Sequence, residues 1–303
     1  MYKVLVYEFG GPEQLKVVEA DDPTPGPGQV VVRMTSVGMN HGELMQRRGE
    51  YKILSGDPPF VPGLEGGGVI DAVGEGVTDR SVGQRVVLTL DSIRGKGAEG
   101  TYKSHFLTDA AKTVPAPDAV PDELLGALWM PYLTSWGCLV WKQDVRAGQT
   151  VLIPAASSSL GLAAAQVVKA RGAIAIGTTT SAAKVEKLKE MPEAKFDHVI
   201  VTRDRQWWRD VKEATKGKGC DAIFDPVGAG EFLSSEIRLL AQGGTLWVYV
   251  LLGRVGPVDV SPLIRKWAAI RGWAMMELEV AGDAVLEAGY RDVFDLMTSG
   301  DYK

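Results

Sequence analysis

The chain has 303 residues, 45% of them hydrophobic, and a formal charge of −5 at pH 7. This length accommodates two domains with separate cores, and the charge lacks the broad positive field that nucleic acid or an anionic membrane requires. No run of about eighteen apolar residues occurs, and no basic start with an apolar core opens the chain. We therefore expect a cytoplasmic protein without membrane anchor or export signal.

Cysteine and histidine are scarce. The two cysteines, Cys138 and Cys220, are too few for a disulfide framework or a thiolate zinc cage, and we expect both in the core. His41, His105 and His198 are too scattered to predict a metal cluster.

The first 120 residues contain short β-rich runs separated by Gly and Pro, with a long turn over 23–28. This pattern predicts a barrel-like β domain. The expected strands are 4–7, 29–36, 68–73, 84–90 and 102–107.

From Pro121 onward, segments of helix length and strand length alternate. We expect a helix over 122–142 and then strands near 150, 173, 198, 221, 245 and 268 with helices between them. Such alternation predicts a doubly wound parallel sheet with its ligand at the carboxyl ends of the strands. Ser181 and Asp204 are candidate helix N-caps.

Residues 150–180 indicate a strand, a tight turn, a helix and a second strand. The strand covers 150–154, small residues follow over 155–159, and strong helix formers fill 160–170 before Gly172. A unit of this kind wraps a dinucleotide.

The dinucleotide fingerprint GxGxxG falls on Ala156, Ser158 and Gly161, so two of its three glycines are absent. The hydroxyls of Ser157, Ser158 and Ser159 are suited to bind phosphate at the positive end of the following helix. The alternative is an ordinary, serine-rich turn of a βαβ unit.

Trp207 and Trp208 are adjacent on a predicted helix and therefore point in different directions. We expect at least one of them to pack against the sheet. The other is a candidate surface contact.

Seven segments along the chain carry a family pattern: 25–44, 62–77, 82–86, 130–139, 155–166, 219–228 and 239–250. They occur in the order found in medium-chain dehydrogenases/reductases, and the chain resembles their zinc-independent quinone oxidoreductase, or zeta-crystallin-like, branch. This resemblance implies an α/β fold with a GroES-like β-barrel catalytic domain (1–120) and a Rossmann NADP-binding domain (121–265). Residues 266–303 would hold the last Rossmann strand and a return toward the catalytic domain, without the family's closing segment.

The same resemblance allows zinc to be tested by position. Where zinc-dependent relatives carry metal ligands, this chain has Asn40, Leu64 beside Glu65, and approximately Met130. No thiolate or imidazole remains to hold Zn²⁺, and residues 91–102 contain no cysteine for a structural zinc lobe. We therefore expect no metal, and a structural role for Glu65.

The cofactor preference is expected from the end of the second Rossmann strand. An NAD site carries Asp or Glu there, whereas this chain has Gly177, Thr178, Thr179, Thr180, Ser181 and then Lys184. We predict NADPH, with Lys184 binding its 2′-phosphate; the alternative is a solvated lysine. The full set of expected cofactor-binding residues is Asn40, Thr134, Ala156, Ser157, Ser158, Ser159, Leu160, Gly161, Thr178, Thr179, Thr180, Ser181, Lys184, Asp225, Val227, Tyr249 and Val250.

By family position, Asn40 and Thr134 should lie beside the nicotinamide and Tyr51 near the mouth of the cleft, and these three are the candidate catalytic residues. Met45 stands where bacterial quinone reductases usually have Tyr. Arg47, Arg48 and Lys52 can attract an anionic acceptor, or they form a solvated charge run.

The predicted function is NADPH-dependent, metal-free reduction of a small quinone or α,β-unsaturated carbonyl, because reducing these acceptors does not need a metal. An enoyl-thioester reductase, an alcohol dehydrogenase-like enzyme and a non-catalytic NADPH-binding structural or regulatory protein remain alternatives. The resemblance also implies a homodimer through the Rossmann edge strand near 245–251. Family chains continue beyond the helix near 283–298 with another strand, a helix and a closing strand, so the chain is either truncated or remodelled there. If the closing strand is missing, we expect an uncovered edge in the β domain.

Overall fold

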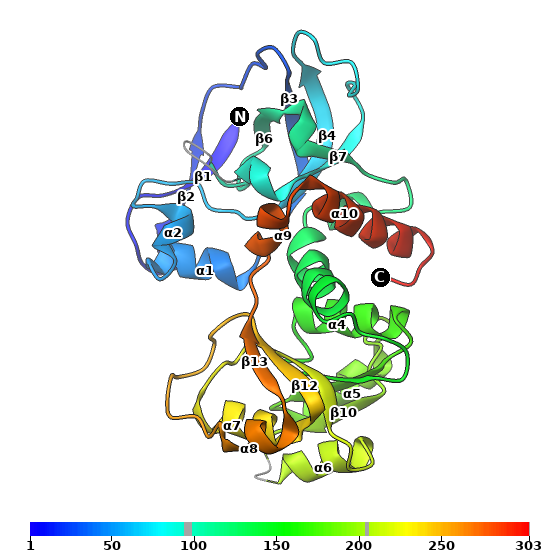
Figure 1. Cartoon of the computed structure of the whole chain (residues 1–303). Helices are drawn as coiled ribbons and strands as arrows, with labels where there is room; N and C mark the ends of the chain where they lie inside the picture. The colour runs from blue at the N-terminus through cyan, green and yellow to red at the C-terminus, as the bar shows by residue number, and fades with distance from the viewer. Residues whose placement is uncertain (94–98, 204–205, 303) are drawn as a thin grey trace. The chain divides into compact units, whose positions relative to one another are not determined.

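A computed structural model describes residues 1–93, 99–203 and 206–302 (Figure 1). The chain divides into two compact units, Met1–Met130 with Tyr290–Thr298, and Pro131–Gly289 with Ser299–Lys303. The first unit thus extends past residue 120 and recruits the C-terminal half of the last helix. The expected N-cap Asp204 lies outside the described residues.

The first unit is built on antiparallel β structure. Its described residues form an open five-stranded sheet in the order β6-β3-β4-β5-β7, and a separate pair, β1-β2. Val30, Val32, Ile70 and Phe106 fill its core. The predicted barrel is therefore a half-barrel. Its strands are β1 (Tyr2–Val6), β2 (Leu15–Glu19), β3 (Gln29–Val37), β4 (Gly66–Val73), β5 (Arg85–Leu88), β6 (His105–Asp109) and β7 (Thr113–Pro115).

Short helices connect these strands: η1 (Pro12–Gln14), α1 (His41–Arg48), α2 (Lys52–Ser55), η2 (Leu90–Ile93), η3 (Ala110–Lys112) and η4 (Asp122–Leu124). The helix α10 (Asp283–Thr298) adds two aromatic rings to the unit. The rings of Tyr290 and Phe294 lie 4.6 and 5.1 Å from that of Trp129, which is fully buried.

The single helix predicted over 122–142 is wrong. After η4 the chain forms π-helical turns η5 (Trp129–Leu133) and η6 (Gly137–Lys142) on either side of α3 (Thr134–Trp136). Pro131 has no N–H to donate and cannot sit in a regular helix interior, which accounts for the irregular first turn.

The second unit contains a parallel sheet in the order β10-β9-β8-β11-β12-β13 (Figure 1). The strand predicted to form the dimer edge, near 245–251, is β12, which pairs on both sides; β13 forms that edge. The strands are β8 (Thr150–Ile153), β9 (Ile174–Thr179), β10 (His198–Val201), β11 (Cys220–Asp225), β12 (Leu240–Val248) and β13 (Ala269–Gly272). The doubly wound fold is confirmed.

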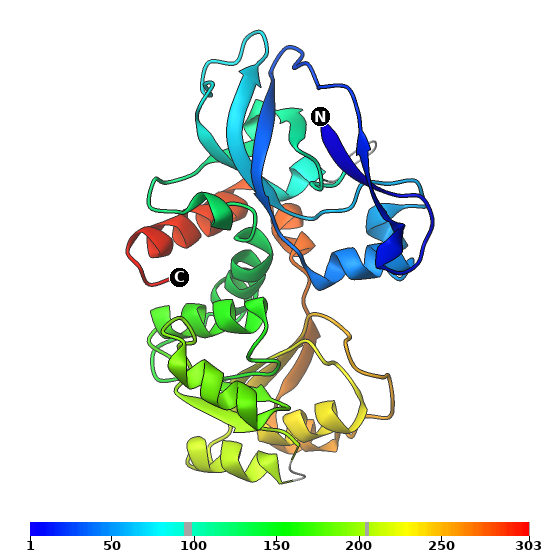
Figure 2. The ribbon, with the colours of Figure 1, turned by 180° about the vertical axis from the view of Figure 1, so that it is seen from behind.

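Helices cover both faces of this sheet (Figures 1 and 2). Leu188 and Ala194 pack on one face beside Ala156, while Val211 and Ile237 belong to the larger core on the other. The helices are α4 (Ser159–Ala170), α5 (Ala182–Glu190), α6 (Trp207–Ala214), α7 (Gly230–Leu239), α8 (Ser261–Lys266) and α9 (Met276–Ala281).

Several predictions about single residues are confirmed. Trp207 is buried and stacks on Phe232, whereas Trp208 is half-buried. Cys138 and Cys220 are both buried. In the described part of the chain, no helix has the length and apolar character needed to cross a bilayer.

Candidate cofactor site

The turn after β8 is shaped by small residues. Ala155 adopts a φ of 52°, and the chain then enters α4 with Ser158 as N-cap, whose Oγ accepts the Gly161 N–H at 3.0 Å. The Ser158 hydroxyl therefore caps the helix and keeps its own proton for a ligand. The fingerprint has the expected geometry without two of its glycines.

Gly161 is required by close backbone approach. A Cβ at this position would lie 2.8 Å from the Ala155 oxygen and 2.9 Å from the Ala156 oxygen. A Cβ on Gly177, in β9, would lie 2.8 Å from the Ala156 Cβ. These glycines let α4 and β9 pack against the turn at the same point.

A cavity of 460 Å³ opens at the carboxyl ends of β8 and β9. This volume falls within the usual range of small-molecule sites. Its lining is neutral except for one lysine. The lining residues are Pro154, Ala155, Ser157, Ser158, Thr178, Thr179, Thr180, Lys184, Thr202, Val227 and Phe232.

The structure brings together seven of the predicted cofactor residues in this lining, from Ser157 in the turn to Val227 after β11. Pro154, Ala155, Thr202 and Phe232 were not predicted. Thr202 follows β10, so the rule that ligands lie at strand ends was a usable signal for it. Ala156, Ser159, Leu160, Gly161, Ser181, Asp225, Tyr249 and Val250 do not line the cavity.

Lys184 supplies the positive charge of this lining. It lies in the first turn of α5 and is exposed, and in the described part of the chain its ammonium forms no ion pair. Ser181 occupies the N-cap position, as predicted, but its side chain makes no capping hydrogen bond. The cavity can thus accept an anion at this end.

Asp225 acts beneath the cavity surface. Its side chain is fully buried and accepts the N–H groups of Val227 and Gly228, both at 2.7 Å. Burial raises the pKa of this carboxyl, although the two backbone hydrogen bonds oppose the rise. Asp225 therefore shapes the turn that presents Val227 to the ligand.

Tyr249 and Val250 follow β12 and are half-buried. The Tyr249 ring stacks on Phe224 at 4.1 Å, and its backbone N–H donates to the Asp225 carbonyl at 3.1 Å. These contacts join the ends of β11 and β12 next to the Asp225 turn.

Thr134 lies in α3 of the second unit and is 6% exposed. Its Oγ1 donates to the Met275 sulfur at 3.4 Å, and its carbonyl accepts the Trp273 indole N–H at 2.9 Å. Sulfur is a weak acceptor, so the hydroxyl can turn to a better partner at little cost.

In the first unit, Asn40 is held by two carboxyl groups. Its Nδ2 donates to Glu65 Oε1 at 2.9 Å and to Glu43 Oε1 at 3.4 Å, while its backbone N–H donates to Glu43 Oε2 at 2.8 Å. Burial raises the pKa of Glu43, and it raises that of Glu65 to about 7. Both amide hydrogens of Asn40 are thus engaged. Its Oδ1 accepts the Glu43 backbone N–H in the capping box of α1 and keeps a second lone pair for a ligand.

Tyr51 and Arg47 fall on either side of the turn after α1. Tyr51 is half-buried at the N-cap of α2. Arg47 is only 5% exposed, so the solvated charge run expected for Arg47, Arg48 and Lys52 is wrong at Arg47. It packs on the buried face of α1 together with Glu43 and Gln46, four and one residues earlier.

The residues present do not fit a catalytic zinc. Leu64 is a buried aliphatic side chain, and Glu65 uses its oxygens for the Asn40 amide and for the Met130 N–H at 3.0 Å. Across the described residues, no group of three or more His, Cys, Asp or Glu side chains is arranged to hold a metal ion.

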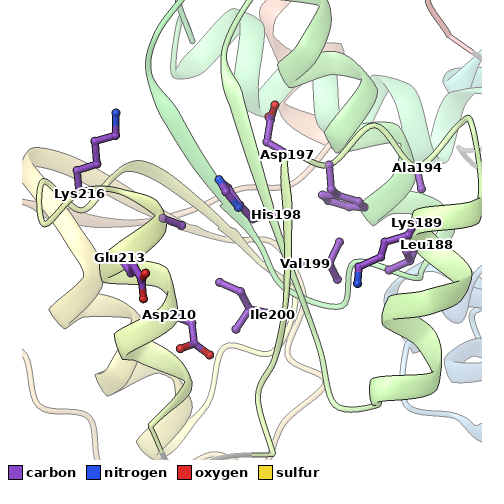
Figure 3. Close-up of a pocket in the computed structure, with 12 residues that line it drawn as sticks. Leu188, Lys189, Ala194, Asp197, His198, Val199, Ile200, Asp210, Glu213 and Lys216 are labelled. Carbon is purple, nitrogen blue, oxygen red and sulfur yellow. The ribbon is translucent and has the colours of Figure 1, made fainter.

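A larger cavity of 760 Å³ runs along the outer edge of β10, between α5 and α6 (Figure 3). Figure 3 shows Lys189 on one wall, Asp210 and Glu213 on the other, and His198 on the strand between them. It contains none of the predicted site residues. Size alone therefore does not locate the dinucleotide site.

Two family descriptions match this chain. "Alcohol dehydrogenase GroES-like domain" matches residues 26–118, and "Zinc-binding dehydrogenase" matches residues 159–292. The second description names a metal for which the residues that the structure describes provide no ligand set.

Curated relatives match over most of their length. The synaptic vesicle membrane protein VAT-1 homolog of Rattus norvegicus is 34% identical over 94% of this chain and 69% of its own. The quinone oxidoreductase of Mus musculus is 32% identical over 86% of this chain and 76% of its own.

Solved structures give the same result. The Escherichia coli quinone oxidoreductase complexed with NADPH matches with a TM-score of 0.84 and 25% identity, and an NAD-dependent alcohol dehydrogenase with 0.87 and 28%. Each match covers 100% of this chain and 90% of the other. The chain belongs to the medium-chain dehydrogenase/reductase superfamily, in its quinone oxidoreductase or zeta-crystallin-like branch, and is an oxidoreductase.

Proposed function

We propose that this protein is an NADPH-dependent, metal-free reductase that transfers hydride to a small quinone or α,β-unsaturated carbonyl. The observation that carries the proposal is the lining of the 460 Å³ cavity, which combines Lys184 and four threonines with no acidic side chain. An acid at this strand end would repel a 2′-phosphate, whereas a lysine and hydroxyls bind one. The Escherichia coli relative complexed with NADPH supports this choice.

The acceptor class follows from the missing metal ligands. Oxidation of a simple alcohol requires a metal or a strong base to remove the hydroxyl proton, and the positions tested for zinc supply neither. When bound, the nicotinamide supplies the hydride. Quinones and enones accept it with hydrogen-bond donors alone, and the quinone oxidoreductase relatives support this class.

The three candidate catalytic residues divide into different roles in this proposal. Asn40 has both amide hydrogens on carboxyl groups, so it offers an acceptor oxygen, which suits a carboxamide N–H₂ better than a developing oxyanion. The hydroxyls of Thr134 and Tyr51 are the donors that remain for the acceptor oxygen. This assignment makes Asn40 a cofactor-orienting residue.

The test is NADPH oxidation by EDTA-treated protein against a panel of quinones and enones, with NADH in parallel. We expect turnover that prefers NADPH, and a Lys184→Ala variant whose KM for NADPH rises about tenfold or more, since a charge-assisted hydrogen bond contributes roughly 1.5–3 kcal/mol. The KM for NADH should not change. Lys187→Ala, on an exposed position of α5, is the matched control.

Three outcomes would contradict the proposal. Loss of activity on EDTA treatment, with recovery on adding Zn²⁺, would show a metal-dependent dehydrogenase. Tight NADPH binding without turnover of any acceptor would favour the non-catalytic binding protein, and turnover of enoyl thioesters alone would favour the thioester reductase.

We also propose a cytoplasmic homodimer. In the segment of chain between β12 and the edge strand β13, Val255, Ile264 and Trp267 are 86%, 79% and 79% exposed. Exposed apolar side chains and an edge strand both favour self-association. Light scattering on the wild type and on Trp267→Glu tests the dimer, and cell fractionation tests the location.

A further inference from the structure

A second, smaller cavity of 370 Å³ lies between α6 and α7 in the second unit. It shares no lining residue with the cofactor cavity or with the groove along β10. Its walls are Trp208 and Lys212 from α6, and Ser235, Arg238 and Leu239 from α7.

Helical spacing explains how these side chains meet. Trp208 and Lys212 are four residues apart on α6, and Ser235 is three and four residues before Arg238 and Leu239 on α7. Leu239 is 1% exposed and forms an apolar floor. The stack of Trp207 on Phe232, with ring centroids 5.3 Å apart, holds the two helices together beside the cavity.

The polar groups that line this cavity are mainly donors. The Lys212 ammonium lies 4.9 Å from the centre of the Trp208 ring and, in the described part of the chain, pairs with no carboxylate. Arg238 donates through one nitrogen to Asp259 at 3.0 Å, which leaves its other N–H groups available. The Ser235 hydroxyl donates a hydrogen bond to the Glu231 carbonyl at 2.9 Å, so its oxygen is left as an acceptor.

The charges around the cavity are arranged by the faces of α6. Asp210 and Glu213 point to the groove along β10, where Figure 3 shows them on its wall, while Lys212 lines the cavity facing α7. Arg209 adds a further cation, 5.3 Å from the Trp208 ring. Burial lowers the pKa of Lys266, and the charge of Lys212 lowers it further, so the two ammonium groups lie within electrostatic range of each other.

We propose that this cavity binds a small organic oxyanion, a phosphate or a carboxylate attached to a flat apolar group. The anionic head would lie between Lys212 and Arg238, and the apolar part against Trp208 and Leu239. A cavity of 370 Å³ exceeds the needs of a bare inorganic ion and lies near the lower end of the range for small-molecule sites.

The test uses three probes in calorimetric titrations of the full chain: phenyl phosphate, benzoate, and phenol as the uncharged ring. We expect phenyl phosphate, benzoate or both to bind, and phenol to bind at least about tenfold more weakly than the tighter anion, because only the anions gain charge-assisted hydrogen bonds. Comparing the two anions distinguishes a phosphate site from a carboxylate site. Inorganic phosphate, titrated in the same way, shows how much of the affinity comes from the anionic group without the ring.

Variants locate the binding. Lys212→Gln and Arg238→Gln should each raise the dissociation constant of the anion by about tenfold or more. Lys187→Gln, which removes one charge from the exposed face of α5, should leave that constant unchanged. Thermal unfolding confirms that each variant is folded. Anion binding that survives both substitutions would place the ligand elsewhere, such as at Lys184, and would overturn the proposal, as would the absence of binding to the wild type.

Discussion

The Asn40 amide and the Glu65 carboxyl group form a hydrogen bond of 2.9 Å between residues that are 25 positions apart in the chain. Glu65 is 3% exposed, and its second oxygen accepts the Met130 N–H at 3.0 Å. The Glu65 carboxyl group therefore links Asn40, at the start of α1, to Met130, the last residue of the segment Met1–Met130 of the first unit. This is the structural role that the sequence predicts for Glu65.

Glu65 should make the stability of the protein depend on pH. Burial raises its pKa from 4.5 to about 7 in the folded state, so the folded protein holds a proton that the unfolded chain releases. The stabilisation is fully present below pH 4.5 and is lost as the pH rises to 7, by roughly 3 kcal/mol. Denaturant unfolding gives the free energy of unfolding of wild type and of Glu65→Gln at several pH values between 4.5 and 7.5. If this free energy falls equally steeply with pH in both proteins, the prediction is wrong.

The N-cap of α4 should contribute measurably to the stability of the second unit. Ser158→Ala removes the side-chain acceptor of the Gly161 N–H, and we expect the free energy of unfolding to fall by about 1 kcal/mol. Ser159→Ala, at the neighbouring exposed position, should change it by less than about 0.5 kcal/mol. Equal losses in the two variants would show that the hydroxyl of Ser158 does not cap the helix.

Gly161→Ala tests the close approach of α4 to the β8 turn. The new Cβ would meet two backbone oxygens at 2.8 and 2.9 Å, and backbone cannot move aside as a side chain can. We expect a loss of about 1–3 kcal/mol in unfolding free energy, and weaker NADPH binding as the turn shifts. Thermal unfolding and fluorescence titration measure both. Gly272→Ala, at an exposed position of β13 where the backbone lies outside the left-handed region and a Cβ meets nothing within 4 Å, is the control for a glycine substitution.

Asp225→Asn should weaken NADPH binding although the side chain does not line the cavity. An amide has a single acceptor oxygen, so one of the 2.7 Å bonds to Val227 and Gly228 is lost and the turn beside the cofactor loosens. We expect a several-fold rise in the dissociation constant for NADPH, with roughly 1–3 kcal/mol less stability. Glu231→Gln, exposed on α7, is the control; an unchanged dissociation constant in Asp225→Asn would remove Asp225 from cofactor positioning.

The strands and helices from residue 150 onward could be predicted because hydrophobic runs and helix formers alternate there and are separated by turn residues. Predictions near 173, 198 and 221 correspond to β9, β10 and β11, since a buried parallel sheet demands continuous apolar strands. Strand β2 was not predicted: it is five residues long, and its side chains are largely exposed although Leu15 and Val17 are among them.

Other features depended on contacts between distant residues. The burial of Arg47 and the place of β12 inside the sheet arise from packing that local patterns do not encode. Thr202 joined the cofactor cavity because β10 pairs with β9, which sets their ends side by side.

By itself, the sequence determined the family, the two types of domain and the neutral, lysine-bearing end of β9, because each of these rests on residue types at fixed spacing. Tertiary structure decided which of the proposed residues meet. It placed Ser158 and Lys184 in one cavity, set Asp225 beneath it, and engaged the amide of Asn40 with two carboxyl groups. Such relationships depend on burial and on hydrogen-bond geometry, which only the folded chain possesses.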